Sequence, residues 1–319
     1  MDLLFVADPI EHFKTYKDST FAMMREAARR GHAIWACLVS DLVWVRGGRV
    51  TAHGARRITL TGDAHDWFTV EEQRDLVVAE AGAVLMRKDP PFDSEYFYAT
   101  HLLGQAEREG ARVFNKPAAL RDHPEKLAIL EFPEHITPTI VTRSEAAIRA
   151  FHAEHQDIIL KPLDGMGGMG IFRVKADGLN LGSIIETLNK GGAETVMVQR
   201  FIPEITAGDK RVLVIGGVPV PYCLARIPQG GEVRGNLAAG GKGVAQPLSA
   251  SDRAIAEALG PTLAARGLLL VGLDVIGDRL TEINVTSPTC FQEIADQTGC
   301  DVASRFIDAL EAALAGAAA

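Results

Sequence analysis

The 319-residue sequence lacks several features that assign a chain to a common class. No apolar run approaches the roughly 20 residues of a membrane-spanning helix, and residues 1–7 lack the basic start of a signal peptide. The cysteines show no C-x-x-C or zinc spacing, so reduced thiols are expected. A net charge of −8 disfavours a broad nucleic-acid surface. We therefore expect a cytoplasmic protein without a membrane or nucleic-acid partner.

Several catalytic signatures are missing as well. No G-x-x-x-x-G-K-[ST] sequence occurs, which excludes a P-loop NTPase, and no G-x-S-x-G nucleophile elbow is present. The protein-kinase signatures His-Arg-Asp and Asp-Phe-Gly are also absent. His152 and His155 lie near the end of a polar helix with no third ligand in view, so we interpret them as solvated.

Strand and helix signals alternate along the chain. In the first 120 residues we expect strands at 3–7, 33–38, 83–86 and 113–114, and helices at 19–30, 70–80 and 94–109. This rhythm predicts a doubly wound, mostly parallel sheet. A turn-rich boundary at 115–124 precedes helices at 125–131, 144–154 and 181–189 and strands at 139–142, 158–162, 170–174 and 195–201. The last third reads as strands over 210–224, a helix at 252–266, a hairpin, and a helix at 302–315.

Glycines cluster directly after the strand at 158–162. Gly165-x-Gly167-x-x-Gly170 has the spacing of a dinucleotide fingerprint, but that motif needs a helix after the glycines. Residues 171–174 are branched and aromatic and predict a strand instead. We therefore expect a strand–loop–strand flap whose N–H groups could cover phosphates, with a mobile surface hairpin as the alternative. Lys161, at the end of the preceding strand, could supply charge to a phosphate.

A second glycine-rich stretch spans residues 227–243 and exceeds the usual loop length. We interpret it as a lid rather than as a flexible linker. Arg234 and Lys242 lie within it, and Arg211 and Arg226 precede it. These cations could neutralise charge that develops on a phosphate.

Acidic and amide side chains interrupt two apolar strands near the C-terminal end. Asp274 lies within the apolar run 268–276, and Glu282 and Asn284 lie two residues apart in the next strand, so they share a face. A three-residue turn at 277–279 would place Asp274 opposite Glu282, whereas a two-residue turn at 277–278 would put it on the other face. Buried carboxylates need a compensating charge, which a hard cation would supply.

Taken together, six segments resemble the ATP-grasp ligases, and within them the bacterial glutathione synthetases. The segments are 86–93, 160–168, 208–213, 221–231, 234–241 and 280–288. The resemblance implies an α/β ATP-grasp fold with an N-terminal doubly wound domain (1–122), a central α+β domain with the glycine flap (123–202) and a C-terminal α+β domain with the lid (203–319).

The resemblance also implies the activity and its residues. ATP and two Mg²⁺ ions, or Mn²⁺, would serve the ligation of glycine to γ-glutamylcysteine in a homo-oligomer, a tetramer by resemblance. The implied ATP-binding residues are Lys126, Lys161, Gly165, Met166, Gly167, Gly168, Gln199, Arg200, Phe201, Ile202 and Asp209. The implied metal ligands are Asp274, Glu282 and Asn284, the catalytic arginines are Arg211, Arg226 and Arg234, and the substrate contacts are Arg87, Asp89, Asn236 and Ser287.

Two other hypotheses remain at this stage. Another ATP-grasp carboxylate–amine ligase, of the D-alanine–D-alanine or glutamate-ligase type, would share the nucleotide half. A non-catalytic ATP-binding scaffold would keep the fold and lose the metal carboxylates or the phosphate lysines, which this sequence retains.

Overall fold

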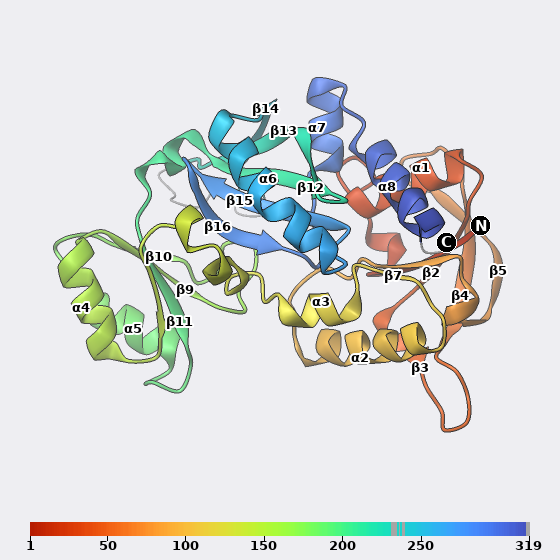
Figure 1. The fold of residues 1–319 in the computed structure, drawn as a ribbon, viewed down its shortest axis with the longest axis horizontal. Coiled ribbons are helices and arrows are strands. Elements are labelled where there is room, and N and C mark those ends of the chain that lie inside the picture. The colour runs from red at the N-terminus through yellow and green to blue at the C-terminus, as the bar shows by residue number, and fades with distance from the viewer. Residues whose placement is uncertain (231–234, 236, 238–239, 317–319) are drawn as a thin grey trace.

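The computed structural model describes residues 1–230, 235, 237 and 240–316, and its strands form three sheets (Figure 1). The seven-stranded sheet has the order β3-β4-β2-β1-β6-β7, with β5 beside β4. Its strands are β1 (Asp2–Val6), β2 (Ala33–Cys37), β3 (Leu42–Val43), β4 (Thr51–Leu60), β5 (Phe68–Val77), β6 (Ala83–Met86) and β7 (Val113–Phe114). Strands β2, β1, β6 and β7 are parallel, whereas β3, β4 and β5 pair antiparallel, so four of the seven strands have the expected parallel pairing.

Helices cover both faces of this sheet, as a doubly wound layer requires. Helices α1 (Ser19–Arg29) and α8 (Val302–Gly316) lie on one face, and α2 (Ser94–Arg108) and α3 (Pro117–Asp122) on the other (Figure 1). Alternate residues of β1 enter the two cores, with Leu3 on the α1 side and Leu4 on the α2 side. A strand buried on both faces is therefore continuously apolar, which explains its sequence.

Two helix predictions are wrong. Residues 70–80 were expected as a helix, but residues 70–77 belong to strand β5, which pairs along its length with β4, and only 78–80 form a 3-10 helix. Almost all of β5 is exposed, so its charged residues carry no alternating apolar pattern that would have marked a strand. Of residues 125–131, only Ala128–Glu131 form a helix, a short 3-10 helix, and Pro133 lies two residues beyond its end.

The four-stranded sheet is antiparallel, has the order β10-β9-β11-β8 and carries its own core. It comprises β8 (Thr139–Thr142), β9 (Ile158–Pro162), β10 (Phe172–Val174) and β11 (Val196–Arg200), with helices α4 (Glu145–His155) and α5 (Leu181–Asn189). Ile148 of α4 and Ile185 of α5 pack on Ile158 and Val198 in a cluster that no other sheet enters. The central part of the chain is therefore packed as a unit.

The five-stranded sheet has the order β14-β13-β12-β15-β16 and is antiparallel. It comprises β12 (Asp209–Ile215), β13 (Val218–Ile227), β14 (Lys242–Pro247), β15 (Leu270–Ile276) and β16 (Arg279–Asn284), with helices α6 (Ala250–Ala265) and α7 (Phe291–Thr298). Leu213 and Leu224 share a core with Leu3 and Phe5 of the first sheet. The seven-stranded and five-stranded sheets are thus packed together. Three elements, α3, β14 and α7, were not expected from sequence.

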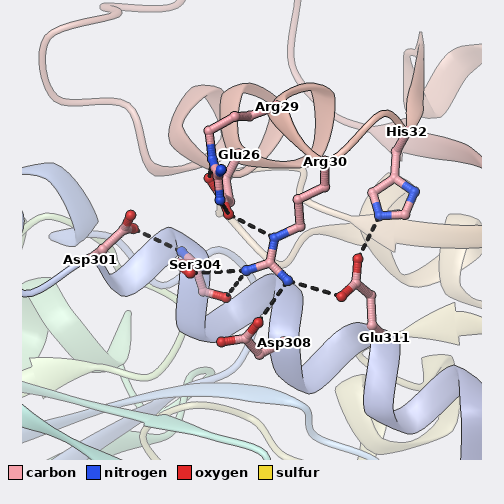
Figure 2. A network of polar contacts seen from close by, with 8 residues as sticks. All are labelled: Glu26, Arg29, Arg30, His32, Asp301, Ser304, Asp308 and Glu311. Carbon is pink, nitrogen blue, oxygen red and sulfur yellow. Dashed lines mark hydrogen bonds and ion pairs between the residues drawn. The ribbon is translucent and has the colours of Figure 1, made fainter.

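A polar network fixes α8 to the end of α1 (Figure 2). The Arg30 guanidinium donates to Glu26 on its own helix and to the carbonyl and hydroxyl oxygens of Ser304 on α8. It also pairs with Asp308 at 2.7 Å and Glu311 at 2.9 Å. Arg30 therefore links α1 to α8, and His32 adds a second contact to Glu311 at 2.8 Å. None of the described helices has the length and apolarity needed to cross a membrane.

Candidate active site

A cavity of about 320 Å³ opens between the four-stranded and five-stranded sheets. Most residues predicted from sequence line it, although they come from segments far apart in the chain. They are Asp89, Lys126, Lys161, Gly165, Met166, Gly167, Gly168, Gln199, Arg200, Phe201, Ile202, Asp209, Arg211, Arg226, Asp274, Glu282, Asn284 and Ser287. Arg234 and Asn236 lie outside the described residues.

The glycine segment forms the expected flap between two paired strands. Strands β9 and β10 pair antiparallel on either side of it, so the unit is strand–loop–strand and not a dinucleotide-binding turn. Gly167, Gly168 and Gly170 have φ values of 61°, 83° and 71°, in the left-handed region that side chains rarely adopt. The backbone can therefore lie close over a ligand at this point.

Two lysines lie beneath the flap. The Lys126 ammonium donates to the Gly165 carbonyl at 2.5 Å and pairs with Glu282 at 3.1 Å. The Lys161 ammonium donates to the Thr281 carbonyl at 3.2 Å and has no carboxylate within ion-pair distance among the described residues. Burial lowers the pKa of Lys161 to about 8. The two ammonium groups repel each other, and a phosphate in the cavity would be attracted by both.

The acidic hairpin has the expected facing residues, but for a different reason. Its turn has two residues, because Ile276 pairs with Arg279, and this turn alone would direct Asp274 to the wrong face. A β-bulge adds one residue to β16, since Val275 pairs with Leu280 and Asp274 with Glu282. The extra residue, Thr281, thus restores the facing of the two carboxylates.

The buried Asp274 carboxylate is paired with two arginine side chains. Its carboxylate accepts from the Arg211 Nε at 2.6 Å and pairs with the Arg226 guanidinium at 2.9 Å. Burial by itself would raise the pKa of Asp274, but Arg211 and Arg226 together outweigh burial and hold that pKa well below its usual range. Arg226 also pairs with Asp209, whose pKa burial raises to about 6. The four groups form one charge cluster at the end of the cavity.

The donor set at the hairpin fits a hard divalent cation. Asp274, Glu282 and Asn284 present carboxylate and amide oxygens to the same cavity. The Asn284 amide nitrogen donates to the Gly272 carbonyl at 3.1 Å, which fixes the amide and leaves its oxygen for a ligand. These three side chains could hold Mg²⁺ or Mn²⁺, which prefer such oxygen ligands.

The linker 199–202 forms another wall of the cavity. The N–H groups of Arg200 and Phe201 already donate to Pro138 and Asp157, both within the protein. The Phe201 ring lies 3.5 Å from the Arg173 guanidinium, which is itself paired with Asp157. The Ile202 N–H makes no hydrogen bond to a described residue, so it is the linker donor best placed for a base edge.

On the opposite side of the cavity, sequence predicts the lining only in part. Arg87 does not line the cavity; it is buried and donates to the Thr20 hydroxyl and the Pro288 carbonyl. Glu125, Thr286, Thr289 and Cys290 line it without having been predicted. They carry no motif of their own, and only the adjacency of Glu125 to Lys126 and of Thr286 to Ser287 could have indicated them. Burial raises the pKa of the Cys290 thiol, so it is held protonated.

The cavity has the parts of a phosphoryl-transfer site and holds no activated protein nucleophile among its described residues. A glycine flap over two lysines faces an acidic, arginine-rich hairpin across a cavity between two α+β units. This arrangement defines the ATP-grasp class of ligases.

Comparison with known proteins gives the family. The model of the prokaryotic glutathione synthetase N-terminal domain matches residues 1–121, and that of its ATP-grasp domain matches residues 125–299. The chain belongs to the prokaryotic glutathione synthetase family and is an ATP-dependent ligase. It is 64% identical over 313 residues to glutathione synthetase of Ralstonia nicotianae, which covers 98% of this chain and 96% of the relative. It is 57% identical over 315 residues to that of Neisseria meningitidis serogroup B, which covers 98% of both.

Solved structures share the fold at lower identity. D-cycloserine synthetase DcsG matches with a TM-score of 0.67 at 17% identity and covers 98% of this chain and 100% of its own. The ATP-grasp ligase PsnB, complexed with the precursor peptide PsnA2 and AMPPNP, matches with a TM-score of 0.62 at 19% identity and covers 98% of both chains. The ATP-grasp fold expected from sequence is thereby confirmed.

Proposed function

We propose that the chain joins glycine to the cysteinyl carboxylate of γ-glutamylcysteine with cleavage of ATP, giving glutathione, ADP and phosphate. The observation that carries the reaction type is the single cavity in which two buried lysines face Asp274 and Glu282. The relatives named glutathione synthetase support the choice of substrates, because they match over almost the whole chain, including its N-terminal half. The process served is glutathione biosynthesis.

The nucleotide would lie between the flap and the five-stranded sheet. Lys126 and Lys161 would bind its phosphates as point charges, with the flap N–H groups above them. The adenine would bind the linker through the Ile202 N–H, and the ribose would bind Asp209. Asp209 Oδ1 is buried without a hydrogen-bond partner among the described residues, which fits a site for a hydroxyl donor.

Asp274, Glu282 and Asn284 would hold two Mg²⁺ ions, for which Mn²⁺ could substitute. Bound there, the ions would neutralise phosphate charge and orient the transferred group. The residues of the protein would keep the site polar and preorganised: Arg211 and Arg226 fix Asp274 and lie ready to stabilise negative charge that develops on the transferred phosphoryl group.

The reaction would proceed in two balanced steps. A cysteinyl carboxylate oxygen forms a bond to the γ-phosphorus while the bond from that phosphorus to ADP breaks, giving an acyl phosphate. The glycine amine then bonds to the acyl carbon and loses a proton as phosphate leaves. The protein supplies position and charge, with Arg234 as a further lid cation, and residues 227–242 would exclude water from the intermediate.

We further propose the three-domain division 1–122, 123–202 and 203–319, substrate contacts at Asp89, Asn236 and Ser287, a tetrameric assembly and a cytoplasmic location. The separate core of the four-stranded sheet supports a distinct central domain. Arg87 would act on substrates only through the loop that it holds.

The deciding experiment is ADP release with each substrate omitted in turn, together with identification of the product. Release that needs both γ-glutamylcysteine and glycine supports the proposal. Activity with D-alanine or glutamate in their place would indicate a different ATP-grasp ligase, and no release with any amine would indicate a scaffold.

A further inference from the structure

Glu125 lines the cavity directly beside Lys126, yet no motif marks it. It follows α3 and precedes the short 3-10 helix at Ala128–Glu131, in backbone that belongs to neither element.

Four hydrogen bonds join Glu125 to the segment that ends the hairpin. Its Oε1 accepts from the N–H groups of Val285 and Thr286 at 3.0 and 3.1 Å and from the Thr286 hydroxyl at 2.9 Å. Its backbone carbonyl accepts from the Ile283 N–H at 2.9 Å. The backbone from 283 to 286 is therefore held at three of its four N–H groups, two of them through one oxygen atom.

This matters because β16 is an edge strand. Among the described residues it pairs only with β15, so no described strand fixes the side that faces away from β15. Glu125 takes the place of that missing strand. The two predicted metal ligands of β16, Glu282 and Asn284, flank the N–H of Ile283 that it binds, and Thr286 and Ser287 continue as the cavity wall.

The charge of Glu125 has no ion-pair partner among the described residues. Burial raises the pKa of its carboxyl, as does Glu282 nearby, while the donors of Val285 and Thr286 oppose both effects. Lys126, the next residue, instead pairs with Glu282 and binds the flap carbonyl of Gly165. One dipeptide thus connects the flap, the hairpin and the cavity wall.

We propose that Glu125 is a positioning residue that sets the place of Glu282 and Asn284, and so the metal affinity, without touching metal or substrate. The role rests on the metal site proposed above. This role requires an acceptor oxygen at the distance from the backbone that a glutamate side chain gives. It does not require the negative charge. Residues of this kind around metal sites change affinity by roughly 10–100-fold when removed.

Substitutions separate reach from charge. Glu125→Gln keeps an acceptor oxygen at the same reach and loses the charge, whereas Glu125→Asp keeps the charge and is one methylene too short. Glu125→Ala loses both. Glu109→Ala is the matched control, since Glu109 also accepts a backbone N–H, from Val50 at 2.7 Å, but does not line the cavity.

The readout is Mn²⁺ binding in the presence of ADP, followed by electron paramagnetic resonance of the free ion, which needs no turnover. We expect Glu125→Asp and Glu125→Ala to weaken binding about 10–100-fold, and Glu125→Gln and Glu109→Ala to stay close to wild type. If Glu125→Ala does not fold, the Gln and Asp variants still decide the question.

Two results would overturn the inference. Weakening by Glu125→Gln as large as that by Glu125→Asp would mean that the negative charge is required as well, and unchanged binding in Glu125→Asp would mean that the length of the side chain does not set the metal affinity. Because binding is measured without ligation, failure of wild-type ligation would refute the proposed substrates alone. A wild-type protein that bound no Mn²⁺ would refute the metal site and this role together, whatever the substrates.

Discussion

Replacing Asp274 with Asn should remove activity and also lower stability, for separable reasons. The carboxylate accepts two hydrogen bonds from Arg211 and forms an ion pair with Arg226. An amide offers one acceptor oxygen, and its NH₂ group would face a guanidinium. Arg211 would then have no carboxylate among the described residues, whereas Arg226 would keep Asp209.

The structure sets the size of the effect. Removing one partner of a buried ion pair costs about 3–5 kcal/mol. The retained Asp209 and the one remaining acceptor reduce this to roughly 2–4 kcal/mol, which corresponds to a fall in melting temperature on the order of 3–6 °C for a chain of this size. Loss of a direct metal ligand should lower turnover by more than about 100-fold, since even outer-shell losses reach that range.

Asp252→Asn is the control for this experiment. Asp252 is fully buried and pairs with Lys210, which is the neighbour of Arg211 on β12 and points to the other face. We expect a comparable loss of melting temperature with unchanged ADP release per folded molecule. Calorimetric melting and coupled ADP release below the transition measure the two effects. A near-normal rate in Asp274→Asn, or an equal loss of rate in Asp252→Asn, would refute the metal assignment.

Three further outcomes are expected. Burial lowers the pKa of Lys161 from its ordinary 10.5 to about 8, so its contribution to stability, present above pH 10.5, is lost as the pH falls through 8. As the pH rises past 8, the Lys161 ammonium loses its proton, so the affinity for ATP measured by calorimetry should weaken. Lys161→Arg should remove that dependence on pH. A short linker in place of residues 230–241 should raise the ratio of phosphate to glutathione released, and an unchanged ratio would contradict the lid role. γ-Glutamylcysteine with ¹⁸O in its cysteinyl carboxylate should deliver label to phosphate; unlabelled phosphate would exclude the acyl phosphate.

The parts of the fold that sequence predicts well are those whose burial is one-sided or complete. Strands such as β1 and β9 are apolar because both faces are covered, and their pattern was sufficient to locate them. Strand β5 was missed because it is exposed, and its position depends on pairing with β4, which no local pattern encodes.

The site shows the same division. Asp274, Glu282 and Lys161 stand out because a charge inside an apolar strand is costly and therefore visible. The facing of the hairpin carboxylates depends on a bulge at Thr281, and a bulge follows from packing in three dimensions. Glu125 was not predicted because a glutamate in irregular backbone has an ordinary sequence context, and its partners lie about 160 residues away.

The hydrogen bonds from Arg30 to α8 have a consequence for how the chain folds (Figure 2). The apolar face of the first sheet is covered partly by Phe306 and Leu310, which are among the last described residues to be synthesised. During translation this face of the first sheet stays uncovered until α8 has been synthesised. The segment 1–122 therefore cannot complete its core as an early, independent unit. The segment 1–122 should accordingly be a poor candidate for expression alone or for exchange between relatives unless α8 travels with it.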